Sequence, residues 1–270
     1  MAQETSRQHP IEIEGVFNVR GFGGYSSTLR PNCFTRDAIL YRSGHLRDVT
    51  ARGLEQIRDL GISTIIDLTN SGETSALFTD TPSSRDQGCR VLRFPLAKHG
   101  FSVQRLSDKY KRYLEEGEKA IAEGYLKLMA DSHDVIRDIL FFIRDNPNDV
   151  YLVHCAMGKD RTGIMFAILL SLSGVPDDVV AEEYSRSESS LEPALPGLAA
   201  AIEKVLPMSE TDAQALERAK IVIKTGKEAM LLTLQMVEER FGGMVQYVNE
   251  HCGIEMEDID RIQDILTYTC

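Results

Sequence analysis

The sequence predicts an α/β fold with a mainly parallel central sheet, flanked by helices and carrying a helical elaboration. Short β-branched or apolar runs alternate with helical segments along the chain, an order that is typical of parallel sheets covered by helices. The run ISTIIDLTN, residues 62–70, is almost continuously apolar, as expected of a strand that is covered on both faces. With 270 residues and 43% hydrophobic residues, the chain is long enough for one large domain with a substantial core.

The first predicted elements are a strand, a helix and a second strand. The segment ILYRSGHL, residues 39–46, predicts a short strand that enters a polar loop. A helix is predicted over 50–61, because Thr50 can cap its start, apolar side chains recur on one face and Gly61 marks its end. The apolar strand over 62–70 follows. Turn-forming residues then predict a loop over 71–88. The segment CRVLRFPL, residues 89–96, predicts the next strand.

The middle of the chain predicts more helices around one more strand. Residues 104–145 are mostly helical in pattern, and SHDVIRDILFFIRD carries apolar side chains at one-face spacing. The turn NPND then leads into a strand over 150–155, VYLVHC. A further helix starts near Pro176, a residue that suits the first helical position. The segment SLEPALPG, residues 190–197, predicts a break before helices that continue to the C-terminus.

These elements predict a single domain over residues 15–270, with the helical elaboration at roughly 187–240. Residues 1–14 lack the pattern of a packed element and predict a flexible, solvated arm. The sequence contains no internal repeats and no low-complexity segments.

Composition and charge exclude several classes of protein. The net charge of −11 argues against a nucleic-acid partner, because phosphate backbones attract basic surfaces. The chain has no apolar run of the ~20 residues that a transmembrane segment needs and no secretion leader, which predicts a cytoplasmic location. The five cysteines have irregular spacings and predict neither a disulfide framework nor a zinc site. A reversible disulfide from Cys33 or Cys89 to Cys155 is an alternative to plain burial of these thiols.

The segment VYLVHCAMGKDRTGIMFAILLSLSG, residues 150–174, places a polar loop between a strand and an apolar helix. The start of a helix binds anions, because its backbone N–H groups are unpaired and its dipole is positive there. Gly158 allows the loop to turn tightly, and Arg161 offers a planar, two-pronged donor that suits phosphate oxygens. These groups also favour the thiolate form of Cys155 at the strand end. The spacing therefore predicts a phosphate site with a cysteine nucleophile.

The loop HCAMGKDRTG, residues 154–163, matches the HCx5R[ST] signature, and with it the chain resembles the protein tyrosine phosphatases. Its GKDRTG ending is similar to that of the atypical PtpB-type tyrosine/serine phosphatases and their fungal relatives. Three further stretches resemble the same branch: FNVRGFGGY, the YRSG segment with its helix and strand, and the helices from Met230 onward. The resemblance covers most of residues 16–266 and implies a tyrosine-phosphatase-like α/β fold.

The resemblance also implies roles for the loop residues. Cys155 would be the nucleophile that forms a phosphocysteine intermediate, Arg161 would grip the phosphoryl oxygens, and Thr162 would hydrogen-bond the thiolate and help it leave. His154 would orient the loop. The implied phosphate-binding positions are Ala156, Met157, Gly158, Lys159, Asp160 and Arg161.

The group that protonates the leaving oxygen has three candidates. Tyrosine phosphatases of the common type supply an aspartate from a mobile loop, but no aspartate follows RFPLAKHG here. The preferred candidates are Asp160, in the loop, and Asp67, at a strand end, with Asp108 as the third. Bracing of the loop by Asp160 and capping of the strand by Asp67 are the alternatives. Gly21 stands where the branch usually has an aspartate, so the role of that aspartate is absent or transferred.

Together these features predict a phosphoprotein phosphatase that hydrolyses phosphotyrosine, with phosphoserine and phosphothreonine as further substrates. The resemblance implies no metal and no cofactor, because the thiolate, the loop amides and Arg161 supply the nucleophile and the charge stabilisation. The predicted partner is a phosphorylated protein. Lys159 permits an alternative, a phosphoinositide or inositol-polyphosphate phosphatase, and a catalytically silent phospho-binding module is another. Arg20 and Arg42 are expected in surface ion pairs, with the pocket mouth as the alternative.

Overall fold

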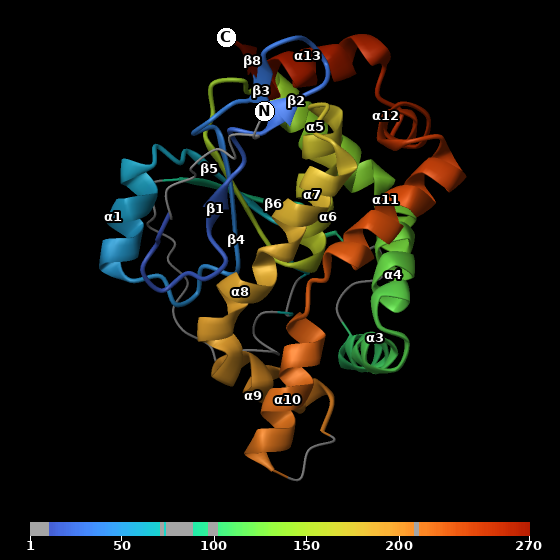
Figure 1. Cartoon of the computed structure of the whole chain (residues 1–270). Helices are drawn as coiled ribbons and strands as arrows, with labels where there is room; N and C mark the ends of the chain where they lie inside the picture. Colours follow the sequence, from blue (N-terminus) through green and yellow to red (C-terminus); the bar gives the residue numbers. More distant parts are fainter. Residues whose placement is uncertain (1–10, 71–72, 74–88, 97–101, 208–210) are drawn as a thin grey trace, which may run out of the picture.

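The computed structural model describes residues 11–70, 73, 89–96, 102–207 and 211–270 (Figure 1). Its central sheet has five strands: Arg20–Gly21 (β1), Leu40–Ser43 (β4), Thr64–Asp67 (β5), Arg90–Arg93 (β6) and Tyr151–His154 (β7). Their spatial order is β1-β4-β7-β5-β6. The last four pair in parallel, and β1 joins β4 in the antiparallel direction. The predicted α/β fold with a mainly parallel sheet is therefore confirmed.

Side chains alternate between the two faces of this sheet, and each face has its own cover. Tyr41, Ile65 and Leu152 occupy adjacent register positions and pack with Ile57 of helix α1 (Ala51–Asp59). Residues beside them in the strands turn to the opposite face, where the larger core holds two helices (Figure 1); these are His133–Asp145 (α5) and Asp160–Leu172 (α6). Helix α6 is buried on nearly every side, as its apolar sequence predicts.

Local sequence signals account for several helix ends. The Thr50 side chain accepts a hydrogen bond from the Gly53 amide and caps α1, as predicted. The helical stretch predicted over 104–145 is interrupted twice, at Gly117 and at Ser132. It therefore forms three helices: Val103–Glu116 (α3), Glu118–Asp131 (α4) and α5.

The predicted break at 190–197 is wrong, because the chain stays helical there. Pro193 and Pro196 each lie at one of the first two positions of a helical segment, where the missing N–H needs no partner. The helices before, across and after this segment are Asp177–Ser185 (α7), Ser187–Leu191 (α8), Glu192–Ala194 (η1), Leu195–Val205 (α9), Asp212–Ile223 (α10) and Lys227–Phe241 (α11). Helices α9 and α10 pack against each other and against α3, and α11 packs on α4 and α7 (Figure 1).

The two ends of the described chain meet in a second, antiparallel sheet that the sequence did not predict. Its strands, in spatial order, are Ser26–Ser27 (β2), Cys33–Thr35 (β3) and Thr267–Thr269 (β8). Before β8 come Met244–Gln246 (α12), Tyr247–His251 (η2) and Met256–Leu266 (α13).

The packed part of the chain also begins earlier than predicted. Ile13 is buried beside α1 and bridges to Val16, and the Glu14 carbonyl accepts a hydrogen bond from the Thr50 amide. Residues 11–14 are therefore not a solvated arm, and residues 1–10 of that prediction lie outside the described residues, as does 71–88 apart from Glu73. Within the described ranges, no helix combines the length and the apolarity that crossing a membrane requires.

Candidate active site

The predicted phosphate loop lies at the carboxyl end of the central strand of the sheet. Residues 155–159 connect β7, which lies between β4 and β5, to the start of α6 at Asp160. Crevices at the carboxyl ends of parallel strands are the usual ligand sites of such sheets. Cys155 follows β7 directly and is only 2% exposed, so the thiol lies at the floor of the loop.

Gly158 makes the turn of this loop, and no other residue fits there. Its φ angle of 65° lies in the left-handed region, and a Cβ atom would lie 2.3 Å from the carbonyl oxygen of Ser43. The loop therefore packs directly on the end of β4.

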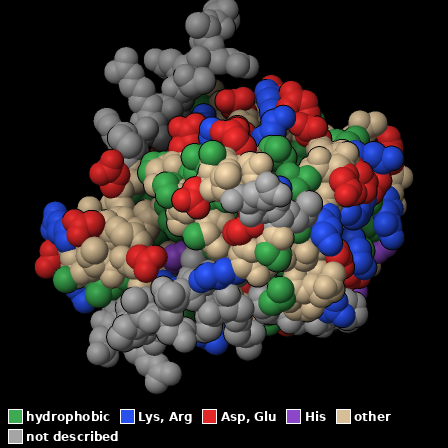
Figure 2. All heavy atoms as spheres, turned by 90° about the horizontal axis from the view of Figure 1, so that it is seen from below, with side chains coloured by type: hydrophobic (Ala, Val, Ile, Leu, Met, Phe, Trp, Pro, Cys, Tyr) green, Lys and Arg blue, Asp and Glu red, His purple; other side chains and the backbone are tan. Residues whose placement is uncertain are grey.

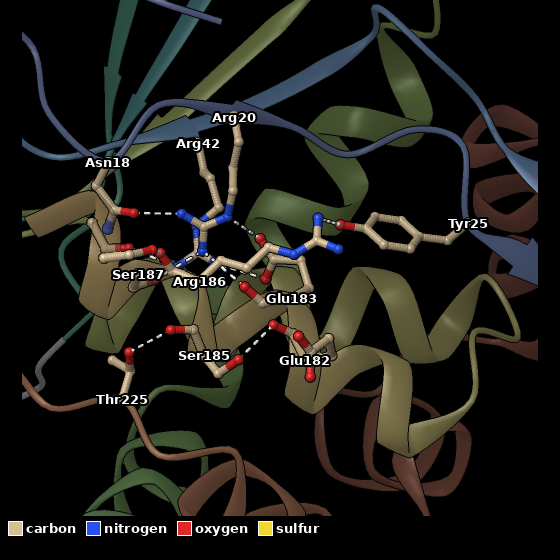
Figure 3. Close-up of polar contacts among 12 residues, drawn as sticks. Asn18, Arg20, Tyr25, Arg42, Glu182, Glu183, Ser185, Arg186, Ser187 and Thr225 are labelled. Carbon is tan, nitrogen blue, oxygen red and sulfur yellow. Dashed lines mark hydrogen bonds and ion pairs between the residues drawn. The ribbon is translucent and has the colours of Figure 1, made fainter. Parts of the chain in front are cut away.

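Two arginines from the N-terminal strands converge on Glu183 (Figure 3), and one of them bonds to the loop. Arg42 is fully buried and donates to the Gly158 carbonyl (2.6 Å) and to Glu183 Oε2 (2.7 Å). Arg20 donates through Nε to Glu183 Oε1 (2.6 Å). Burial and the neighbouring charge of Arg42 lower the pKa of Arg20 to about 10. Both residues form ion pairs as expected, but these pairs are buried in the protein rather than at its surface.

The predicted phosphate-gripping residue, Arg161, is held by a carboxylate of the same chain. Its guanidinium makes a two-pronged ion pair with Glu73, one bond of which measures 2.7 Å, and donates to the Leu68 carbonyl at 3.3 Å. Burial opposes the charge of both groups, but their mutual attraction outweighs it, so the pKa of Glu73 is lowered and that of Arg161 is raised. Glu73 thus occupies the fork that suits a phosphoryl group.

Lys159 points away from the loop and does not offer its charge to a second phosphate. Its side chain is 1% exposed, and its ammonium group donates to the Val222 carbonyl of α10 (2.6 Å) and lies 5.2 Å from the ring centroid of Tyr113. Burial lowers the pKa of Lys159. The lysine ties the loop to the helical elaboration, so the feature that permitted a phosphoinositide substrate is engaged elsewhere.

Asp160, predicted to be catalytic, is a braced and ionised carboxylate. It accepts hydrogen bonds from Lys109 Nζ (2.6 Å) and the Tyr125 hydroxyl (2.5 Å), and Lys159 Nζ lies 3.7 Å away. Burial alone would raise the pKa of Asp160, but the two lysines and these hydrogen bonds hold it well below its usual range. A carboxylate in this state has no proton to give, which favours the bracing alternative.

The other two candidate acids differ in their position. Asp67 ends β5 beside the end of β7, accepts from the Thr69 amide (2.9 Å) and hydroxyl (2.6 Å), and lies 4.0 Å from His154 Nε2. Burial lowers the pKa of His154 despite this neighbouring carboxylate. Asp108 is exposed on α3, where its carboxylate accepts a hydrogen bond from Gln104 (2.8 Å).

A cavity of about 330 Å³ adjoins the phosphate loop, between α3 and α4. Arg161, Asp160 and Glu73 line its inner end. Most of the cavity wall is apolar, although charged side chains also line it. The apolar lining residues include Leu96, Leu106, Tyr113, Ala120 and Leu128. The face seen in Figure 2 interleaves acidic and basic side chains rather than presenting a field of one sign.

Comparison with known proteins identifies the family of this chain. The model of the tyrosine phosphatase family matches residues 11–268. The chain belongs to the tyrosine phosphatase family.

Individual relatives of this phosphatase align with most of its length. It is 24% identical over 287 residues to the triple specificity protein phosphatase PtpB of Mycobacterium tuberculosis, covering 94% of this chain and 98% of that one. It is 26% identical over 172 residues to a tyrosine-protein phosphatase of Nostoc commune, covering 64% of this chain and 55% of the relative. The crystal structure of TpbA from P. aeruginosa aligns with a TM-score of 0.31 at 17% identity, covering 72% of this chain and 96% of that one.

Two features of the phosphatase site have no local signal in the sequence. Glu73 lies 88 positions before its partner Arg161, and Glu183 lies 141 positions after Arg42.

The hydroxyl of Thr162 is buried without a hydrogen-bond partner among the described residues, so the predicted bond to Cys155 is not formed in this state. A buried hydroxyl left unpaired costs free energy, which fits a group kept for a partner that forms during the reaction.

Proposed function

We propose that this tyrosine phosphatase hydrolyses phosphotyrosine in proteins through a phosphocysteine formed on Cys155. The thiolate attacks phosphorus, a sulfur–phosphorus bond forms, and the bond from phosphorus to the tyrosine oxygen breaks. Water then attacks the phosphocysteine, the sulfur–phosphorus bond breaks, and inorganic phosphate leaves with the thiolate restored. The observation that carries this proposal is the position of Cys155 directly after a strand and of Arg161 in the first turn of the helix that follows the loop.

The loop supplies the charge stabilisation for both steps. Its amides, the N-terminus of α6 and the guanidinium of Arg161 surround the phosphoryl oxygens. Arg161 exchanges Glu73 for the phosphoryl group when substrate enters, because both offer paired oxygens to the same fork. The unpaired hydroxyl of Thr162 then donates to the departing thiolate.

We assign the proton of the leaving oxygen to Asp67. Asp160 is held by Lys109 at 2.6 Å, whereas Asp67, at the end of β5, has a looser ion pair of 3.7 Å with the exposed Arg93. Asp108 is exposed on α3, so Asp67 is the preferred candidate. Asp67→Asn should lower kcat for a phosphotyrosine peptide by about 10²-fold, a usual contribution of general acid catalysis. The loss should be much smaller with p-nitrophenyl phosphate, whose leaving group needs no proton. An equal loss with both substrates would contradict the assignment.

The substrate range follows from the same site. A relative is named as a triple specificity protein phosphatase, which supports activity on more than one class of phosphorylated substrate; phosphoserine and phosphothreonine are the further substrates that we propose. The phosphoinositide alternative is weaker than the sequence suggested, because Lys159 is bound to the Val222 carbonyl. The apolar cavity beside Arg161 supports an aromatic leaving group rather than an inositol ring. The cytoplasmic location, the absence of a nucleic-acid partner and the independence from metals and cofactors remain predictions.

The test is phosphate release by the wild-type chain and by Cys155→Ser. The panel contains a phosphotyrosine peptide, a phosphoserine peptide and a soluble phosphoinositide, in EDTA, from pH 5 to 8. We expect Cys155-dependent turnover that is fastest on the phosphotyrosine peptide. Turnover of the phosphoinositide alone would replace the substrate class, and binding of the phosphopeptide without turnover would leave a phospho-binding module.

A further inference from the structure

Three consecutive carbonyl groups of the phosphate loop are bonded on the side that faces the N-terminal strands. The Ala156 carbonyl accepts from the His45 amide (3.1 Å), and the Met157 carbonyl accepts from Asn18 Nδ2 (3.0 Å). The third, that of Gly158, accepts from Arg42 at 2.6 Å. None of these donors belongs to the loop itself.

This arrangement fixes the direction of the loop amides. Because a trans peptide unit is planar, a carbonyl and the N–H of the following residue point in opposite directions. Bonds that hold these carbonyls outward therefore turn the N–H groups of Met157, Gly158 and Lys159 toward the concave side of the loop. Successive inward N–H groups form the anion-binding concavity that a phosphoryl group requires.

One carboxylate holds two of the three donors in place (Figure 3). Glu183 of α7 binds Arg42 directly through Oε2. Through Oε1 it binds Arg20, whose Nη1 donates to Asn18 Oδ1. The bond from Arg20 to Asn18 Oδ1 orients the Asn18 amide, so that its NH2 group and not its oxygen faces the Met157 carbonyl.

The rest of this network removes the freedom of Arg20. Its Nη2 donates to the Ser187 hydroxyl (2.8 Å) and to the Glu183 carbonyl (3.1 Å) at the junction of α7 and α8. The Glu183 side chain is 2% exposed and that of Arg42 is not exposed at all. Two guanidinium groups share one carboxylate, so this buried unit leaves a net positive charge beneath a loop that binds an anion.

We propose that Asn18, Arg42 and Glu183 are positioning residues of the phosphatase, which preorganise the loop amides for the phosphoryl group. The proposal rests on the proposed function in that it assigns the loop to phosphate. Asn18 and Arg42 act through the Met157 and Gly158 carbonyls, and Glu183 acts through the two arginines. None of the three touches the substrate.

The sharpest test is Asn18→Asp, which keeps size and shape but faces the Met157 carbonyl with an oxygen instead of a donor. Two quantities are measured on the full chain: the Kd of inorganic phosphate by calorimetry, and kcat/KM on a phosphotyrosine peptide. We expect the Kd to rise about tenfold or more and kcat/KM to fall by about 10–100-fold, the size of effect known for groups that orient the ligands of metal sites. The melting temperature reports whether the fold is kept.

Asp258→Asn is the matched control. It exchanges a carboxylate for an amide of the same shape, the reverse of the change in Asn18→Asp. It weakens the ion pair between Asp258 and Arg144 (2.9 Å), which joins α13 to α5. We expect it to leave the Kd and kcat/KM within twofold of wild type at a similar cost in melting temperature. A purely structural role for Asn18 would give both variants the same unchanged constants and would overturn the proposal.

A second variant keeps the result decisive if Asn18→Asp does not fold. Asn18→Ser removes the reach to Met157 without placing a charge there, and the same rise in Kd is expected; constants within twofold of wild type would again overturn the proposal. Failure of the proposed function is distinguishable, because a wild-type chain without turnover that binds phosphate still allows the Kd comparison.

Discussion

Two glutamates hold arginines on either side of the same loop, and they do so in different ways. Glu183 binds Arg20 and Arg42, which also donate to backbone carbonyls, to the Ser187 hydroxyl and to the Asn18 side chain, while Arg42 Nε has no hydrogen-bond partner among the described residues. Glu73 binds Arg161, which also makes a longer bond of 3.3 Å to the Leu68 carbonyl. The side chain of Arg42 is wholly buried, whereas that of Arg161 is 14% exposed and lines the cavity.

The difference separates a brace from an exchangeable contact. An ion pair whose two partners are buried in the fold is part of the scaffold, because no solvent or ligand can reach and replace either group. An ion pair that borders a cavity can exchange its carboxylate for a phosphoryl group of similar shape. The same two residue types therefore serve stability at Glu183 and phosphate binding at Glu73.

The largest expected difference between the two pairs is in stability. Glu183→Ala leaves two buried guanidinium groups without a counter-charge, so the free energy of unfolding should fall by about 3–5 kcal/mol. Glu73→Ala leaves a guanidinium that borders the cavity and can be hydrated, so its loss should be much smaller. Urea unfolding of the two variants measures the difference, and equal losses would show that both pairs are braces.

The stability that Glu183 provides should depend on pH in a defined direction. Burial opposes its charge, but Arg20 and Arg42 outweigh burial and lower the pKa of Glu183 below the ordinary 4.5. A lowered pKa contributes stability that is fully present above pH 4.5 and is lost as the pH falls through the value of the folded state. The gap in unfolding free energy between wild type and Glu183→Ala should therefore narrow from pH 6 to pH 3. A gap that widened over this range would contradict the ion pairing.

Glu73→Gln tests the exchangeable contact itself. Phosphate can bind Arg161 only after Glu73 has left, so weakening this competitor should lower the Kd of inorganic phosphate, by about tenfold if the pair is worth ~1.4 kcal/mol. Glu123→Gln is the control, since it removes a carboxylate paired with Arg112 at the same cavity but not with Arg161. A Kd that rose in Glu73→Gln would mean that Glu73 orients Arg161 for phosphate instead of competing with it.

Much of this site could be predicted because its signals are local. The strand end, the loop and the helix start lie within residues 150–174, and their order alone predicts an anion site next to Cys155. The central sheet was predictable for the same reason, since its strands 64–67 and 151–154 are apolar or β-branched up to their last residues, Asp67 and His154. The remaining strands outside the central four have two or three residues each, too few to show a period of two.

The interactions around the loop could not be predicted, because each joins distant parts of the chain. Arginine is rarely buried unless it is paired, so surface positions were the reasonable expectation for Arg20 and Arg42 in the absence of a visible partner. The partner, Glu183, lies within a helix whose sequence shows nothing unusual. Pro193 and Pro196 show the converse problem, because a proline in the first turn of a helix has the same local signature as a proline that ends one.

The smallest effect on activity should come from replacing Lys159, the loop residue whose charge permitted the phosphoinositide alternative. Its ammonium group is bound to the Val222 carbonyl and its side chain is buried, so it cannot reach a second phosphate. Lys159→Met, which keeps the length of the side chain, should change the ratio of kcat/KM between a soluble phosphoinositide and a phosphotyrosine peptide by less than about twofold, well below the effect of a direct charged contact. A selective loss on the phosphoinositide would show that Lys159 leaves Val222 to bind that substrate, and would make this second contact exchangeable, like that of Glu73.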